Sequence, residues 1–196
     1  MTTAEAVARH FVHLANQMEE PTPLTHMQVQ KLVYYAQGWS LAYYKKPLFL
    51  EPIEAWQHGP VVDRVYQEFK KFGGEAIAAK VGTSATDLSS EETELLRWVW
   101  QRYSRYSGSY LRELTHRERP WKEAWGARPS DDRARVPISD AALSEFFREQ
   151  AQKEAKNIGI DLDELEASIA DAKAGRTAVL DLSSYAGNRG TARGKS

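Results

Sequence analysis

Apolar residues recur at helical spacing along most of the first 150 residues. Val7, Phe11 and Val12 share one face of a helix predicted over 4–17. The following stretch, 25–46, is apolar over much of its circumference, a pattern typical of a helix at the centre of a fold. Two helices are therefore predicted before residue 47, and the second is expected to be the core.

Short local signals mark where helices begin. Thr25 with Gln28 and Ser89 with Glu92 each have the spacing of a capping box, in which a hydroxyl and a carboxamide or carboxylate satisfy backbone N–H groups. Gly38, inside the second helix, costs about 1 kcal/mol relative to alanine. We expect this glycine to make room for a close neighbour, one of the many aromatic rings.

The helical pattern breaks after residue 46. Prolines at 47 and 52 within an apolar stretch predict extended chain, a short β-ribbon or edge strand near 48–58. Gly59 is expected to end it, with Pro60 at the start of the next helix. That helix has an amphipathic repeat and is stopped by a glycine pair. The repeat consists of Val62, Val65, Tyr66, Phe69 and Phe72, and the pair is Gly73 and Gly74.

Three further helical segments follow. The first begins after Ser89, and the second lies near 107–119, with Pro120 opening a further turn. Ser139 then caps a helix that carries Leu143, Phe146 and Phe147. The predicted fold is mainly α, a compact helical domain of about six helices with a small β-ribbon near residues 48–58.

Composition divides the chain near residue 152. Residues 1–151 carry nearly all the aromatic side chains, whereas 152–196 form a C-terminal extension. Within the extension, Asp161–Ala174 has an acidic, amphipathic pattern that predicts a short helix, and the basic end is predicted to be disordered. We expect one domain and an appendage.

Bulk composition narrows the class of protein. The chain has 196 residues, 42% of them hydrophobic, and a net charge of −1. Overall charge therefore argues neither for nor against nucleic acid or an anionic membrane as a partner. There is no cysteine, which excludes disulfides and cysteine-based zinc sites. No apolar run reaches the length of about 20 residues that a membrane span needs, and no signal peptide is evident. A cytoplasmic location is expected.

Known catalytic patterns are missing from the sequence. His10 and His13 are three residues apart on one helix, but no complete metal-binding motif surrounds them. No G-x-S-x-G elbow and no phosphate-binding glycine loop is present. We therefore predict no catalytic, cofactor-binding or metal-binding residues and no enzymatic activity.

Two stretches could nevertheless carry function. "EAWQHGPVV" could be the mouth of an active site with His58 as acid or base, or a rigid Gly-Pro corner with a packed tryptophan, and the corner needs fewer assumptions. Between Arg102 and Arg135, eight arginines and Lys122 are interleaved with aromatic rings against five acids. Such a stretch can bind a nucleic acid strand, or can be a solvated face over core rings.

Three blocks in this sequence resemble one family. "QKLVYYAQGW" begins at Gln30, "PLFLEPIEAWQHGPVVDRVYQEFKKFGG" begins at Pro47, and "LTHRERPW" begins at Leu114. The residues of these blocks and their order along the chain are similar to those of the Panacea domain, also called the SocA-like or GepA-like antitoxin family. The resemblance covers about residues 5–150. The resemblance implies a cytoplasmic, sometimes phage-associated antitoxin that binds and neutralises a protein toxin, which is typically encoded next to it. It implies no catalysis.

The resemblance leaves the mechanism open. Neutralisation could be direct, or the protein could be an adaptor that delivers the toxin to a protease. The alternatives outside the family are a nucleic-acid-binding regulator and a small hydrolase that uses His58 or His116. We expect the toxin to be contacted by exposed rings and charges near the corner and in the arginine-rich segment. The candidates are Trp56, His58, Arg117, Trp121 and Lys122.

Overall fold

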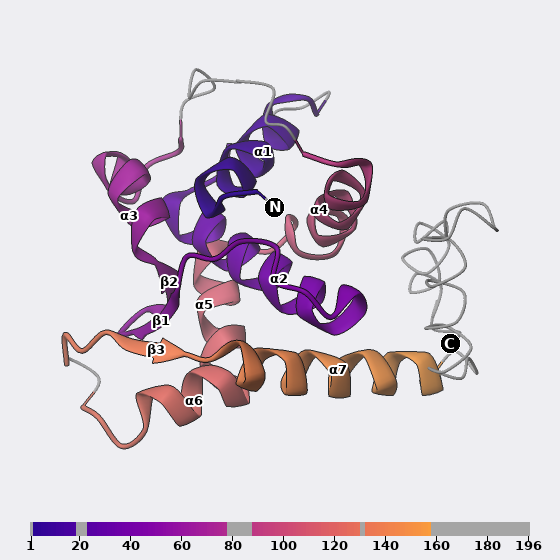
Figure 1. Cartoon of the computed structure of the whole chain (residues 1–196). Coiled ribbons are helices and arrows are strands. Elements are labelled where there is room, and N and C mark those ends of the chain that lie inside the picture. The colour runs from indigo at the N-terminus through magenta and orange to yellow at the C-terminus, as the bar shows by residue number, and fades with distance from the viewer. Residues whose placement is uncertain (1, 19–22, 78–87, 130–131, 158–196) are drawn as a thin grey trace, which may run out of the picture. The chain divides into compact units, whose positions relative to one another are not determined.

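The protein is mainly helical, as predicted, with one small antiparallel sheet. A computed structural model describes residues 2–18, 23–77, 88–129 and 132–157 (Figure 1). Its α-helices are α1 (Ala4–Asn16), α2 (His26–Tyr44), α3 (Asp63–Phe69), α4 (Ser90–Tyr103), α5 (Gly108–Arg117), α6 (Arg119–Trp125) and α7 (Asp140–Asn157). A 3-10 turn, η1 (Lys70–Phe72), extends α3. The strands are β1 (Ile53–Trp56), β2 (Gly59–Val62) and β3 (Val136–Ile138), in the order β2-β1-β3.

The chain divides into two compact units, Met1–Gln150 and Ala151–Ser196. The predicted acidic helix, 161–174, and the basic end lie outside the described residues. None of the described helices is long and apolar enough to cross a membrane.

Helix α2 is the centre of the first unit. It packs against α1, α4, α5 and β2, which surround it in Figure 1. Every residue from Gln28 to Ala42 is buried, as expected for a helix that is apolar on several sides. The capping boxes predicted at Thr25 with Gln28 and at Ser89 with Glu92 are present, whereas α1 is capped by Thr3 and not by a box of Thr2 with Glu5. The local signals thus set the start of two helices correctly.

The side chains of two glutamines of α2 form hydrogen bonds with the backbone of extended segments of the chain. The side-chain oxygen of Gln30 accepts from the Val62 N–H at 3.0 Å, and its nitrogen donates to the Val62 carbonyl at 3.3 Å. Gln37 similarly accepts from the Leu48 N–H at 2.9 Å and donates to the Phe49 carbonyl at 3.2 Å. These buried amides replace the ladder partners that the extended segments lack, so they are structural side chains.

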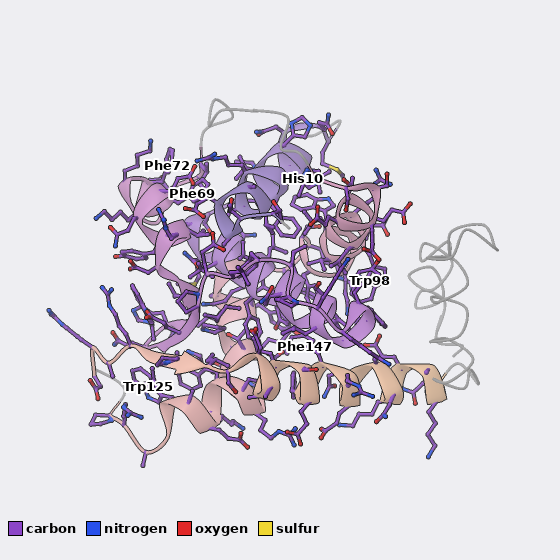
Figure 2. The ribbon with its side chains drawn as sticks, viewed as in Figure 1. His10, Phe69, Phe72, Trp98, Trp125 and Phe147 are labelled. Carbon is purple, nitrogen blue, oxygen red and sulfur yellow. The ribbon has the colours of Figure 1, made fainter. Side chains whose placement is uncertain are left out.

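Gly38 has the close aromatic neighbour that was expected. The ring of Phe147, on α7, lies where a Cβ at this position would be, so any larger residue would collide with it. Figure 2 labels Phe147 on the side of α7 that faces α2. The glycine therefore lets α7 approach the central helix closely.

The predicted ribbon is displaced, and the predicted helix start at Pro60 is wrong. The strands occupy 53–56 and 59–62, and Pro60 pairs with Ala55 in β2. Gly59 has φ +99°, which closes the two-residue turn, and Gln30 then holds Val62 in extended form. Helix α3 begins only at Asp63. The third strand, β3, was not predicted.

Two helix boundaries, the end of η1 and the start of α7, lie where the sequence predicted them. Gly73 ends η1 with φ +54°, and a Cβ there would meet nothing within 4 Å. Ser139 accepts from the Ala142 N–H at 3.2 Å, at the start of α7. Both are local signals, and both were predicted correctly.

Candidate protein-binding surface

A set of buried polar side chains lies where α2, the β1–β2 hairpin and α5 meet. We call it the inner polar group. Its members are Lys31, Tyr34, Tyr35, Thr115 and Glu118. The first four are at most 1% exposed, and they come from two of the blocks that carried the family resemblance. Their partners show what those blocks do.

Lys31 joins the central helix to the hairpin. Its ammonium group donates to the carbonyl of Pro60 at 2.9 Å. Burial lowers the pKa of Lys31 to about 7, with a further lowering by Arg112, whereas the carboxylate of Glu118 acts in the opposite direction. Burial of a lysine ammonium costs free energy unless the group is hydrogen-bonded. The bond to the Pro60 carbonyl offsets part of that cost.

Glu118 ties the junction of α5 and α6 to α2. The Tyr34 and Tyr35 hydroxyls donate to its two carboxyl oxygens at 2.8 and 2.9 Å. Although the residue as a whole is half-buried, these oxygens point to hydroxyls in the core. Burial raises the pKa of Glu118 to about 7, while the two hydrogen bonds and Lys31 lower it. Both oxygens therefore have partners within the protein.

The hairpin turn is pressed directly onto this group. A Cβ at Gly59 would lie 2.7 Å from the Lys31 nitrogen and 2.9 Å from the Thr115 hydroxyl oxygen. Thr115 is itself fixed, since its hydroxyl donates to the Arg112 carbonyl at 2.9 Å. The turn residue His58, which precedes the glycine, is thereby held beside α5.

Two of the predicted contact residues, Trp56 and Trp121, meet at the base of the hairpin. The Trp121 indole donates to the Trp56 carbonyl at 3.0 Å. Trp121 is 9% exposed and stacks between His116, at 3.9 Å, and Trp125, at 5.5 Å between ring centroids. Figure 2 labels Trp125 between α6 and β3. Trp121 thus supports the surface from beneath.

Trp56 is half-buried and covered from two directions. The Arg135 guanidinium lies 4.2 Å from its ring centroid, and the Tyr66 ring lies 5.0 Å away. Its indole donates to Glu54 at 2.8 Å. Trp56 therefore anchors the sheet and leaves part of its ring at the surface.

The three remaining predicted residues have exposed side chains. His58 forms the hairpin tip, and Lys122 projects from α6. Arg117, on α5, has a side chain 73% exposed and an ion pair with Glu113 at 3.2 Å. His58 lies close enough to His116 for their charges to interact, so it joins the tryptophan region. Within the described ranges, neither Arg117 nor Lys122 forms a hydrogen bond or a cation–π contact with Trp56 or Trp121.

A comparison with family models gives one match. Residues 29–122 match the model described as "antitoxin SocA-like, Panacea domain". The chain is similar to this family over that segment, which we call the Panacea segment. Comparisons with curated proteins and with solved structures gave no significant match.

The Panacea segment runs from α2 to α6 and contains every candidate contact residue. Elements on either side of it complete the same unit: α1 packs against α2, β3 pairs with β1, and Phe147 of α7 packs on Gly38. The matched segment therefore depends on flanking helices and a flanking strand for its core.

One surface feature of the Panacea segment was not singled out from the sequence. Arg112 and His116 lie one turn apart on α5, and His58 lies beside them at the hairpin tip. We call these three residues the outer cationic group. The Arg112 Nε and the His116 Nε2 are both buried and have no hydrogen-bond partner in the described part of the protein. Arg112 was missed because it is one of eight arginines in its segment.

The histidines do not combine into a metal site within the described ranges, where no group of three or more possible ligands occurs. His10 and His13 have ring centroids 6.3 Å apart on α1, remote in sequence from the Panacea segment. Burial lowers the pKa of His116 to about 4, aided by the charges of Arg112 and Lys31. At neutral pH its imidazole is therefore uncharged.

Proposed function

We propose that this protein is the antitoxin of a toxin–antitoxin system and neutralises a protein toxin by binding it directly. The observation that carries the proposal is the match of residues 29–122 to an antitoxin family. The toxin is expected to be the product of the neighbouring gene. The protein acts as a binding module and has no enzymatic step.

The hydrogen bonds made by residues of the family blocks support a role for these blocks as a rigid scaffold for binding. The polar side chains Gln30, Lys31, Gln37 and Glu118 each bond to the backbone or to a hydroxyl of the same domain. These hydrogen-bonded side chains hold the hairpin, α5 and α6 in one arrangement. A preorganised surface loses little conformational entropy on binding, which favours tight association.

We place the toxin-binding surface on the hairpin tip and the adjoining faces of α5 and α6. His58, Arg117 and Lys122 are exposed there, and Trp56 and Trp121 support them. A stable protein complex buries on the order of 1,600 Å² in total, so the interface must extend beyond these five residues. Tyr110, on the first turn of α5 and 52% exposed, is available to extend it.

Co-expression tests this proposal. The neighbouring open reading frame is placed under an inducible promoter, alone and together with this chain, and growth and co-purification are measured. We expect arrested growth with the frame alone, and restored growth with a stable complex when both are present. A frame that is harmless alone, or equally toxic with this chain present, would refute the proposal.

The same cultures distinguish blocking from delivery to a protease. Direct neutralisation leaves the toxin level unchanged or higher, because the toxin is held in a complex. An adaptor would lower the toxin level in a way that depends on a host protease. Immunoblotting of a tagged toxin over the induction period measures this difference.

A further inference from the structure

At neutral pH the positive charge of the outer cationic group lies on Arg112, and the Glu113 carboxylate acts on the group by raising the pKa of His116. The two acids nearest to it along the chain already have other partners: Glu113 pairs with Arg117 at 3.2 Å, and Glu118 accepts from Tyr34 and Tyr35. The Arg112 Nε is buried and has no hydrogen-bond partner in the described part of the chain. Arg112 as a whole is half-buried, so part of its side chain reaches the surface of the proposed interface.

The positions of these residues follow from the hairpin contact. Thr115 touches the hairpin at Gly59, and Arg112 and His116 flank Thr115 on α5. His58 directly precedes the glycine, so its imidazole is presented to the same side of α5. The mutual effects of charge among Arg112, His116 and His58 agree with this placement.

Unsatisfied buried donors are unfavourable in a free protein. Leaving a buried donor without a partner costs about 1–3 kcal/mol, and more for a charged group. The Arg112 Nε has this character. The His116 Nε2 is a second buried polar atom without a partner in the described residues. Such a cost is recovered when a ligand supplies the acceptor, and a carboxylate is the acceptor that a guanidinium matches best.

We propose that Arg112, His116 and His58 form a receptor for an acidic side chain, an aspartate or glutamate of the bound protein. The inference rests on the proposed function for the identity of the partner, but the chemistry of the site stands on its own residues. The carboxylate pairs with the Arg112 guanidinium and accepts from an imidazole N–H. Trp121, stacked under His116, keeps that ring in place.

The receptor selects among partners by charge. A toxin that presents an acidic side chain at this point gains charge-assisted hydrogen bonds, whereas one that presents a lysine is repelled by the same group. The chemistry therefore specifies one feature of the toxin surface, an exposed aspartate or glutamate facing the hairpin tip.

A peptide titration tests the receptor independently of the toxin. An acetylated, amidated tetraglutamate peptide is added to the full chain, and the imidazole resonances of His58 and His116 are followed by NMR, with tetraglutamine as the control peptide. We expect both resonances to shift with tetraglutamate only. Arg112→Met should weaken binding by about 10- to 100-fold, the range of one charge-assisted hydrogen bond.

Arg105→Met provides the matched control, because Arg105 is an exposed arginine beyond the opposite end of α5. It should change the dissociation constant by less than about twofold. Absence of peptide-induced shifts at His58 and His116 in the wild type would overturn the proposal. Equal binding by Arg112→Met and the wild type would do the same.

The neighbouring gene product gives the second arm. Its affinity for Arg112→Met should fall by a similar factor and for Arg105→Met should stay unchanged. If it does not bind the wild type while tetraglutamate does, the proposed antitoxin function fails and the receptor stands. If it binds Arg112→Met as tightly as the wild type, the receptor has no part in the complex and the proposal is wrong.

Discussion

The inner polar group and the outer cationic group both lie near the contact between the hairpin and α5. They differ in whether their polar side chains have hydrogen-bond partners. In the inner group, the ammonium of Lys31 and the carboxyl of Glu118 each have partners within the domain. In the outer group, the buried nitrogens of Arg112 and His116 have none in the described residues. Satisfied groups hold the fold together, whereas a buried polar atom without a partner calls for an explanation, which the proposed receptor supplies.

The largest effect is expected from removing the shared acceptor of the inner group. Glu118→Leu leaves the hydroxyls of two buried tyrosines without a partner, so the free energy of unfolding should fall by about 3 kcal/mol. Glu123→Leu, at an exposed position of α6, should change it by less than about 0.5 kcal/mol. Urea titration of both variants measures the difference. Equal stability of the two would contradict a structural role for the inner group.

The next effect concerns the hairpin turn. Gly59→Ala places a Cβ against Lys31 and Thr115 at a positive φ, and should destabilise the protein by about 2 kcal/mol. Gly73→Ala also has a positive φ but meets no atom, so only the conformational cost of about 1 kcal/mol is expected. Thermal unfolding of both variants separates packing from backbone strain. A larger loss at Gly73 would mean that the turn is not pressed onto α5.

The smallest effect on stability, and a clear effect on titration, is expected in the outer group. Arg112→Met removes a buried donor without a partner, so the free energy of unfolding should rise by about 1 kcal/mol. The pKa of His116 should rise from about 4, because one of the charges that oppose its protonation is gone. NMR titration of the imidazole measures it, and Arg105→Met should have no such effect. An unchanged pKa of His116 in Arg112→Met would show that the two residues do not interact.

The sign of the pH dependence follows from the same shift. The folded pKa of His116 lies below the ordinary value of 6.5, so the unfolded state binds the extra proton first. The contribution of neutral His116 to stability is therefore complete above about pH 6.5 and is lost as the pH falls towards 4. In Arg112→Met that loss should be smaller, since the folded pKa lies closer to the unfolded one.

Local signals explain which parts of the fold could be predicted from the sequence. The capping boxes at Thr25 and Ser89 involve residues three positions apart, and the central position of α2 follows from its own apolar circumference. Strand β2 was predicted as a helix because its extended form depends on Gln30, 32 residues away. Strand β3 has three residues, one of them Pro137, and becomes a strand only by pairing with β1.

The contacts among the candidate residues depend on long-range packing in the same way. Trp56 and Trp121 stand in recognisable blocks, but their hydrogen bond joins residues 65 positions apart. Arg112 was overlooked although the sequence holds a signal: no acid lies three or four positions from it, whereas Arg117 has Glu113 and Arg119 has Glu123. Arginines on a helix that lack such a neighbour are candidates for contacts with a partner.

The affinity of the neighbouring gene product for two charge-reversed variants tests the central claim most directly. Arg112→Glu and Arg105→Glu are compared with the wild type by calorimetry, after urea titration has shown that neither has lost more than about 0.5 kcal/mol of stability. The account predicts that Arg112→Glu loses roughly 100-fold or more in affinity, because it sets a carboxylate against a carboxylate, and that Arg105→Glu binds like the wild type. Binding of Arg112→Glu as tight as that of the wild type would contradict it.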